Sequence, residues 1–260
     1  MAEDTGPGAD GPTQPICAGA VRASLTRTVR TPLDRRRVLT AAIGYIDEHG
    51  LDALTMRRLG AHLGVEGMAL YRHVTGREDL LDGVVELVID ALYGDPDVYL
   101  TPEYGWQDYL QRLAHGVRRM AIAHPEVFPL VATRPPAAPW VRPPLRSLRW
   151  LDSFLDALTS HGFSDEAAVA AYRAYTSFLL GHLLLEVSQR GVPISPLDDA
   201  DADASPPADG RSLAEFPHVR RLAHLLAEDE SATEFEESLE NLLERLARML
   251  RESERPGSPV

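Results

Sequence analysis

The sequence predicts an all-α fold, with a three-helix head over residues 31–94 and a helical bundle, the body, over residues 95–255. Three observations support this prediction. Apolar residues recur at spacings of three and four along most of the 260 residues, which is the period of an amphipathic helix. Residues 54–74 contain two short helical patterns joined by a glycine-centred turn. Two long apolar helical patterns occupy residues 165–190 and 231–252.

The head is predicted to begin with a helix that has Thr31 as its N-cap and Pro32 at its first position, and that ends at Gly50. Its apolar stripe consists of Val38, Ala41, Ala42, Tyr45, Ile46 and His49. A later helix is predicted to open with a capping box formed by Thr75 and Glu78. Its apolar stripe consists of Leu81, Val84, Val85, Val88, Ile89 and Leu92. Each stripe is typical of a helix with one buried face.

Between these two helices, residues 54–74 read LTMRRLGAHLGVEGMALYRHV. Thr55 is a predicted N-cap, and Gly64 lies at a sharp turn that favours the left-handed backbone of a glycine. Gly60 has no side chain, which allows two helices to approach closely. Four apolar residues are predicted to face inward: Leu59, Leu63, Val65 and Leu70. This pattern is typical of a helix-turn-helix that enters the major groove of DNA, and the alternative is an ordinary corner in an all-helical protein.

Residues 33–85, from LDRRRVLTAAIGYIDEHG to REDLLDGVV, resemble the N-terminal domain of the tetracycline-repressor family. The match has no gap and includes the LGV turn, the LY-x-HV segment and the following R-x-x-LL. The resemblance implies a helix-turn-helix DNA-binding head on a helical ligand-binding and dimerisation domain. It therefore implies a homodimeric, ligand-responsive transcriptional regulator, expected to be a repressor that a small molecule releases from a palindromic operator.

The DNA-contacting positions of the family fall on Thr55, Arg57, Gly67, Met68, Ala69, Tyr71, His73 and Arg77. Arg72 also faces outward on the predicted recognition helix, residues 66–73. Tyr71 and His73 match the family pattern, in which these side chains contact phosphates. Residues 67–69 carry almost no hydrogen-bonding groups, unlike members with polar side chains there, which argues against direct base readout by these three.

The composition limits the kind of nucleic-acid binding to a local surface. The net charge of −13 argues against a protein that coats nucleic acid nonspecifically. All 26 basic residues are arginine, a usage that continues through the body and favours a genome-wide coding bias over selection for DNA. Between Thr55 and Arg77, however, four arginines face one acid, Glu66.

No segment has the length or composition of a membrane span or a secretory signal. The uncharged run at residues 174–185 is shorter than the roughly 20 apolar residues that a bilayer requires. We therefore expect a cytoplasmic protein without a membrane partner. Residues 1–30 are expected to be a disordered tail, with a DNA minor-groove arm as the alternative, and residues 191–214 a flexible loop.

A second, shorter resemblance concerns the body, where Gly162, Phe163 and Ser164 precede a long alanine-rich helix as in the tetracycline-repressor type of C-terminal domain. In that arrangement, aromatic and amphipathic side chains are expected to surround a largely apolar effector cavity. These residues are Phe128, Trp150, Phe154, Tyr175, Phe178 and His182. The alternative is that they fill the core, because periodicity does not distinguish a lined cavity from a packed one.

The chain carries no recognisable catalytic motif. It contains no HExxH, G-x-S-x-G, P-loop or dinucleotide fingerprint, so we expect neither an enzyme nor a cofactor. The single cysteine, Cys17, leaves no disulfide framework. His115 and His182 are candidates for a ligand or metal contact, with a core or boundary role as the alternative, and no metal site is predicted.

The long helices at residues 165–190 and 231–252 offer more apolar surface than one body needs to cover. We expect them to pack against their symmetry mates as a four-helix bundle. The alternative function is a helical small-molecule-binding protein or enzyme that kept the fold without binding DNA. The sequence does not distinguish an activator from a repressor.

Overall fold

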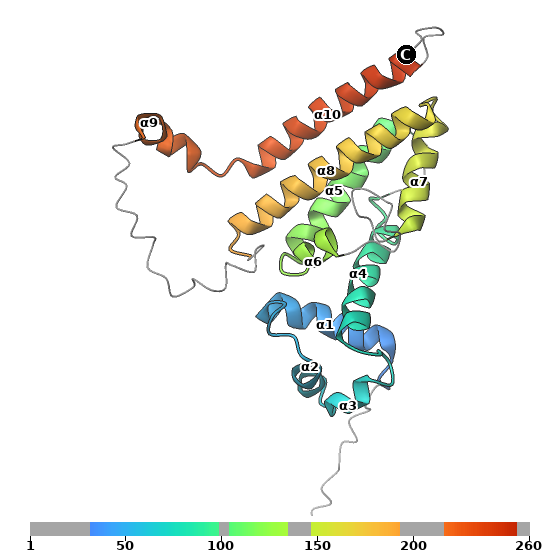
Figure 1. Cartoon of the computed structure of the whole chain (residues 1–260), viewed down its shortest axis with the longest axis vertical. Helices are drawn as coiled ribbons and strands as arrows, with labels where there is room; N and C mark the ends of the chain where they lie inside the picture. Colours follow the sequence, from blue (N-terminus) through green and yellow to red (C-terminus); the bar gives the residue numbers. More distant parts are fainter. Residues whose placement is uncertain (1–31, 99–103, 135–146, 193–215, 254–260) are drawn as a thin grey trace, which may run out of the picture. The chain divides into compact units, whose positions relative to one another are not determined.

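The computed structural model describes residues 32–98, 104–134, 147–192 and 216–253, and within them all regular secondary structure is α-helical (Figure 1). The all-α prediction is confirmed. The predicted tail at residues 1–30 and nearly all of the predicted loop at residues 191–214 lie outside the described residues.

The head contains α1 (Arg35–His49), α2 (Met56–His62) and α3 (Gly67–Leu70), followed by α4 (Arg77–Tyr93). Helix α2 packs against α1 and α3, and α1 packs against α4. The predicted apolar stripe of α4 is buried along its whole length. In α1 the stripe is buried except for Ala41, which is half-buried, and His49, which is exposed and packs its ring against Tyr45.

Helix α1 begins later than predicted. Its N-cap is Asp34, whose carboxylate accepts a hydrogen bond of 2.8 Å from the backbone N–H of Arg37. Pro32 therefore precedes the helix, and Thr31 lies outside the described residues. The acid expected in the first turn is thus itself the cap, because its carboxylate reaches a free N–H group three residues on.

Helix α4 also begins one residue later than predicted, so the expected capping box of Thr75 and Glu78 is wrong. Asp79 occupies the third helical position, and its carboxylate accepts from the backbone N–H of Thr75 at 2.7 Å and from its hydroxyl at 3.2 Å. Glu78 instead accepts a hydrogen bond from Arg134 of the body. Asp79, rather than Glu78, is therefore the acid whose side chain turns back and accepts hydrogen bonds from the residues before the helix.

The turn between α2 and α3 depends on glycine, as predicted. Gly64 has φ of 69°, in the left-handed region. A Cβ atom on Gly60 would lie 2.8 Å from the backbone nitrogen of Gly67 and 2.9 Å from its Cα. The two helices therefore touch backbone to backbone at this point.

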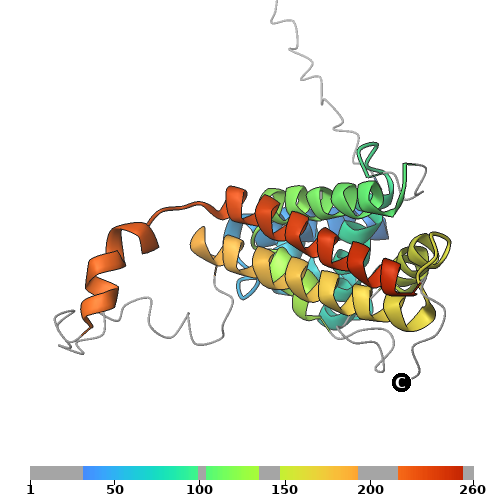
Figure 2. The ribbon, with the colours of Figure 1, turned by 90° about the horizontal axis from the view of Figure 1, so that it is seen from above.

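The body contains α5 (Trp106–Ala123), α6 (Phe128–Thr133), α7 (Leu148–Thr159), α8 (Asp165–Gln189), α9 (Pro217–Leu226) and α10 (Ser231–Ser253). Helix α8 packs against α5, α6, α7 and α10, and Figure 2 shows α5, α8 and α10 side by side. Ser164 caps α8 as predicted, with its hydroxyl accepting from the backbone N–H of Ala167.

The apolar stripe of α10 is buried within its own chain. Its buried residues are Phe235, Leu239, Leu243 and Leu246. These side chains pack towards α8 and α5, so this stripe is not free to pack against a symmetry mate as the sequence suggested.

Ion pairs at Arg134 and at His124 help to join head and body. Arg134, whose side chain is only 12% exposed, donates to Asp82 at 2.7 Å and to Glu78 at 2.8 Å on α4. At the end of α5, His124 Nδ1 lies 2.7 Å from Asp47 Oδ2 on α1. Helix α4 itself contacts α1, α5 and α6, so the predicted boundary between residues 94 and 95 stays a prediction.

We predict that Gly60→Ala destabilises the head by about 1–3 kcal/mol, because the new Cβ atom meets backbone atoms that a side-chain rotation cannot move. Gly44→Ala is the control, since a Cβ atom on Gly44 of α1 has nothing within 4 Å. That substitution should be neutral or stabilise by up to about 1 kcal/mol. Urea denaturation measures both, and an equal effect of the two substitutions would contradict the backbone contact.

We also predict a pH-dependent contact between head and body at His124. The hydrogen bond with Asp47 raises the pKa of His124 above its usual value, against a smaller lowering by burial. A pKa raised by folding stabilises the protein fully below the unfolded pKa, and this stabilisation is lost as pH rises through the folded pKa. We therefore compare the urea denaturation midpoints of wild type and His124→Asn. The midpoint of wild type should be higher, and the difference should be larger at about pH 5.5 than at about pH 9.

Asp47→Asn provides the matched control for this experiment. It removes the carboxylate that raises the pKa of His124, so it should remove most of the same pH dependence. A difference between wild type and His124→Asn that is the same at both pH values would contradict the prediction.

Candidate DNA-binding face and effector cavity

The helix-turn-helix presents a short recognition segment, residues 67–73. Helix α3 ends at Leu70, and the chain continues as a turn in which the N–H groups of His73 and Val74 both donate to the Leu70 carbonyl, at 2.8 and 3.0 Å. The segment is therefore less regular than the helix predicted over residues 66–73. At the start of α2, Thr55 is the N-cap as predicted, accepting from the Arg58 N–H at 3.2 Å.

The predicted DNA-contacting residues differ in how they face solvent. Met68 and Tyr71 are 74% and 46% exposed, and Thr55, Arg57, Arg72 and Arg77 are also exposed. Ala69 and His73 are half-buried. Gly67 was expected to face outward, but it faces α2. A Cβ atom on Gly67 would lie 3.1 Å from the Met56 carbonyl oxygen. The close contact of the two helix backbones explains this difference.

A charged network fixes the end of the recognition segment. The guanidinium of Arg35 donates to both oxygens of Asp79, at 2.7 and 3.2 Å, and to the His73 carbonyl at 2.9 Å. The hydrogen bond from Arg35, followed by that from the Thr75 backbone, lowers the pKa of Asp79 to about 2. Sequence analysis missed Arg35 and Asp79, because the network joins residues 44 positions apart.

The charge around the recognition segment has the sign that DNA requires. The arginines at positions 57, 58, 72 and 77 are all exposed, and Glu66 is the acid among them. Arg58 and Arg77 also donate to backbone carbonyls, those of Ala53 at 3.1 Å and Leu51 at 3.4 Å. This face is therefore locally basic although the chain carries a net charge of −13.

A small cavity of about 50 Å³ lies inside the body where α4, α5, α6, α7 and α8 meet. It is lined by Ile89, Leu92, Val117, Met120, Phe128, Val131, Trp150, Tyr175, Thr176, Leu179 and Leu180. Three of the six residues predicted for an effector site, Phe128, Trp150 and Tyr175, are thus brought together. Phe154 is fully buried behind the cavity wall, with its ring 5.4 Å from that of Tyr175.

The other two predicted residues belong to a different cluster. Phe178 and His182 lie against the ring of Phe235 on α10, at centroid distances of 5.9 and 5.3 Å. His115 contacts the same ring at 5.9 Å. The helical spacing that placed these residues on one face of α8 did not show that α10 covers part of that face.

Neither candidate histidine belongs to a set of metal ligands in the described residues. His182 Nε2 lies 3.3 Å from the Ser231 carbonyl at the start of α10. His115 Nε2 lies 3.6 Å from a carboxylate oxygen of Glu236. Both rings thus contact α10 near its N-terminal end.

The cavity wall contains a buried hydrogen-bond donor. The indole nitrogen of Trp150 is buried and has no hydrogen-bond partner among the described residues, and neither has the hydroxyl of Tyr109 nearby in the core. The Tyr175 hydroxyl, by contrast, donates to the Leu110 carbonyl at 2.7 Å. Because an unsatisfied buried donor is costly, Trp150 offers a position where an acceptor would be favoured.

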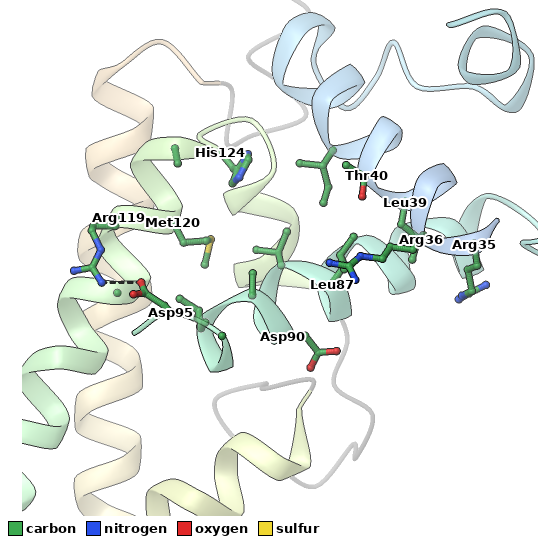
Figure 3. A pocket seen from close by; sticks show the side chains of 17 residues that line it. Arg35, Arg36, Leu39, Thr40, Leu87, Asp90, Asp95, Arg119, Met120 and His124 are labelled. Atoms are coloured by element: carbon green, nitrogen blue, oxygen red, sulfur yellow. Dashed lines mark hydrogen bonds and ion pairs between the residues drawn. The ribbon is translucent and has the colours of Figure 1, made fainter. Parts of the chain in front are cut away.

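A second hollow, which sequence analysis did not predict, is an open groove of about 940 Å³ between α1, α4 and α5 (Figure 3). Leu92 and Met120 line both the groove and the interior cavity. No helix in the described parts of the chain is both long and apolar enough to cross a membrane.

Comparison with known proteins agrees with this geometry. Residues 38–84 match the family model of bacterial regulatory proteins of the tetR family, and residues 100–250 match the tetracyclin repressor-like C-terminal domain. The tetracycline repressor protein class A from transposon 1721 of Escherichia coli is 30% identical over 187 residues, which are 67% of this chain and 82% of that protein. An HTH-type transcriptional regulator of Saccharopolyspora erythraea is 28% identical over 154 residues, 59% of this chain and 61% of the relative.

A solved structure shows the same arrangement over nearly the whole chain. The Streptomyces coelicolor TetR family protein ActR, in complex with actinorhodin, has a TM-score of 0.61 and 27% identity, and the match covers 86% of this chain and 100% of ActR. The C-terminal family model alone covers more than half of this chain. The protein is therefore a ligand-responsive, DNA-binding transcriptional regulator that belongs to the tetracycline repressor family.

Proposed function

We propose that this protein is a dimeric repressor that leaves a palindromic operator when a small molecule binds inside its body. The observation that carries the proposal is the course of α4. Its first turn holds Asp79, which accepts hydrogen bonds from Arg35 and Thr75. Arg35 in turn donates to the His73 carbonyl at the end of the recognition segment. Its last turns place Ile89 and Leu92 on the wall of the interior cavity. One helix therefore joins the DNA-binding face to the effector cavity.

The mechanism follows from this connection. In a dimer, each head places its recognition segment in one of two successive major grooves, so the separation of the heads must match the DNA repeat. A molecule that displaces the α4 side chains of the cavity wall favours a different position of α4. It weakens DNA binding only by the factor with which it prefers that second conformation.

For the effector we propose a small, largely apolar molecule with at least one hydrogen-bond acceptor. The apolar wall of the cavity and the unpartnered indole N–H of Trp150 support this choice. The relative ActR has been solved with actinorhodin bound, which supports a small-molecule effector for this fold. We further propose that the protein is a regulator without catalytic activity, acting in the cytoplasm where operator DNA lies.

The direct test is a gel shift with DNA upstream of the gene for this protein, followed by selection of bound sequences from random DNA. A specific shift that a small molecule reverses is expected. Absence of any specific complex in both experiments would favour the alternative of a helical binding protein or enzyme that does not bind DNA.

We predict that Tyr71 positions the head through phosphate rather than base contacts. Tyr71→Phe should then weaken binding to the operator and to scrambled DNA to a similar degree. Arg57→Ala should lower the slope of log affinity against log salt by roughly one unit per head, if its exposed guanidinium contacts a phosphate. Tyr104→Phe is the control, since Tyr104 is also an exposed tyrosine, at 75%, but lies in the body. A loss confined to the operator would contradict the role assigned to Tyr71.

We predict that the outer ridge of α8 forms the dimer. Its exposed positions recur every four residues at Val169, Arg173, Ser177, Gly181 and Leu185. Because a Cβ atom on Gly181 meets nothing within 4 Å in its own chain, Gly181→Glu should give a folded monomer.

The control for the dimer prediction is Leu243→Glu on α10. Leu243 is only 6% exposed within its own chain, so this charge should unfold the body rather than separate the protomers. Sedimentation and circular dichroism distinguish the two outcomes. A Gly181→Glu protein that stays dimeric would contradict the assignment of the ridge.

A further inference from the structure

The groove between α1, α4 and α5 has the form of a small-molecule site. Its volume of about 940 Å³ lies within the range of roughly 300–1,000 Å³ that is usual for such sites. The apolar side chains that line it are Leu39 and Ile43 of α1, Leu87, Val88 and Leu92 of α4, and Met120 of α5. Ala91 and Ala123 face it from α4 and α5 and are exposed.

Most of the charged groups around the groove already have partners. Arg35 is paired with Asp79 at 2.7 Å, and Arg119 with Asp95 at 2.7 Å. The hydrogen bond from Arg119 lowers the pKa of Asp95. A third basic group of the lining, His124, is paired with Asp47 at 2.7 Å. These three pairs are locally neutral or nearly so when the histidine is protonated.

Arg36 differs from these groups, because it has no hydrogen bond or ion pair among the described residues. Figure 3 shows its side chain extending from α1 towards α4 beside Leu87, at the wall of the groove. Asp90 is the remaining charged group of the lining, and Figure 3 shows its carboxylate on the side of α4 away from Arg36. The groove thus combines an apolar floor with one available cation.

We propose that this groove binds a small amphipathic anion, whose apolar part lies on the floor and whose carboxylate or sulfonate pairs with Arg36. A guanidinium binds such groups through paired N–H donors, which favours an anion over a neutral molecule. The site is separate from the interior cavity, although both contact Leu92 and Met120.

The position of the groove gives the site a regulatory consequence. Its walls come from α1 of the head and α5 of the body, with α4 between them. A molecule bound there contacts both sides of the junction that moves when the heads change position, so we expect it to bind the two conformations with different affinity. This consequence depends on the proposed repressor function, whereas binding in the groove does not.

The test uses 1-anilinonaphthalene-8-sulfonate, an aromatic sulfonate that fluoresces in apolar sites, titrated into the full-length protein. We expect saturable binding that Arg36→Gln weakens by about 2- to 5-fold, as for loss of one partly exposed ion pair. Arg37→Gln is the matched control, because it removes an arginine from the same turn of α1 outside the groove lining. It should leave the affinity unchanged.

A second pair of variants tests the groove by its volume. Ala91→Trp places a large side chain in the groove from an exposed position and should weaken binding at least 10-fold, whereas Ala91→Ser keeps the groove open and should bind as wild type. Thermal melting confirms that each variant is folded. Binding that is unaffected by both Arg36→Gln and Ala91→Trp would overturn the site.

The regulatory consequence is tested by titrating the same probe with and without a saturating operator selected from random DNA. We expect the affinity for the probe to differ at least about 5-fold, the lower range of allosteric coupling. Equal affinities would overturn the coupling. Failure of the free protein to bind any specific DNA would instead count against the proposed repressor function, which distinguishes the two failures.

Discussion

The carboxylate of Asp79 joins the parts of the head that must move together. It accepts hydrogen bonds from Arg35 on α1 and from Thr75 after the recognition segment, while belonging to the first turn of α4. Helix α3 has four residues and buries Leu70 alone, too little for independent stability. The orientation of the recognition segment therefore depends on its connections. With a pKa of about 2, Asp79 stays ionised wherever the protein is folded at ordinary pH.

Helix α4 connects the head to the body, because its buried residues pack both against α1 and into the core of the body. Helix α4 packs against α1, with Gly83 lying close to the Leu39 side chain, and Ile89 and Leu92 reach the interior cavity of the body. Arg134 fixes α4 to the body through Asp82 and Glu78 and is itself largely buried. His124 and Asp47 are more exposed, and their hydrogen bond raises the pKa of His124. A change of pH should therefore affect the contact at His124 more than the one at Arg134.

Local features were predictable from the sequence and long-range ones were not. The buried stripe of α4, the glycine turn at Gly64 and the Ser164 cap follow from spacing and from backbone chemistry within a few residues. The cap of α4 by Asp79 was missed because a one-residue shift in helix start changes which acid can turn back. The outward orientation expected for Gly67 failed because the contact with α2 is tertiary.

The effector residues show the same limit. Periodicity placed Tyr175, Phe178 and His182 on one helix and suggested a common cavity. In the structure Tyr175 reaches the cavity, whereas Phe178 and His182 contact Phe235. Which neighbour covers each part of a helix face depends on the crossing of α8 with α10, and no local pattern encodes that crossing. The groove beside Arg36 was missed for the same reason, since three separate helices form it.

If the proposed effector enters the interior cavity, the size of that cavity links its binding to movement. At about 50 Å³ it holds no more than a few water molecules, so an organic effector must displace the side chains of the wall. Close-packed interiors do not absorb such displacement locally, and Ile89 and Leu92 carry it into α4. Because the opposite end of α4 holds Asp79, any shift of the helix changes the bonds that orient residues 71–75. In the proposed mechanism, occupying the cavity and disturbing the DNA-binding face are therefore two descriptions of one structural change.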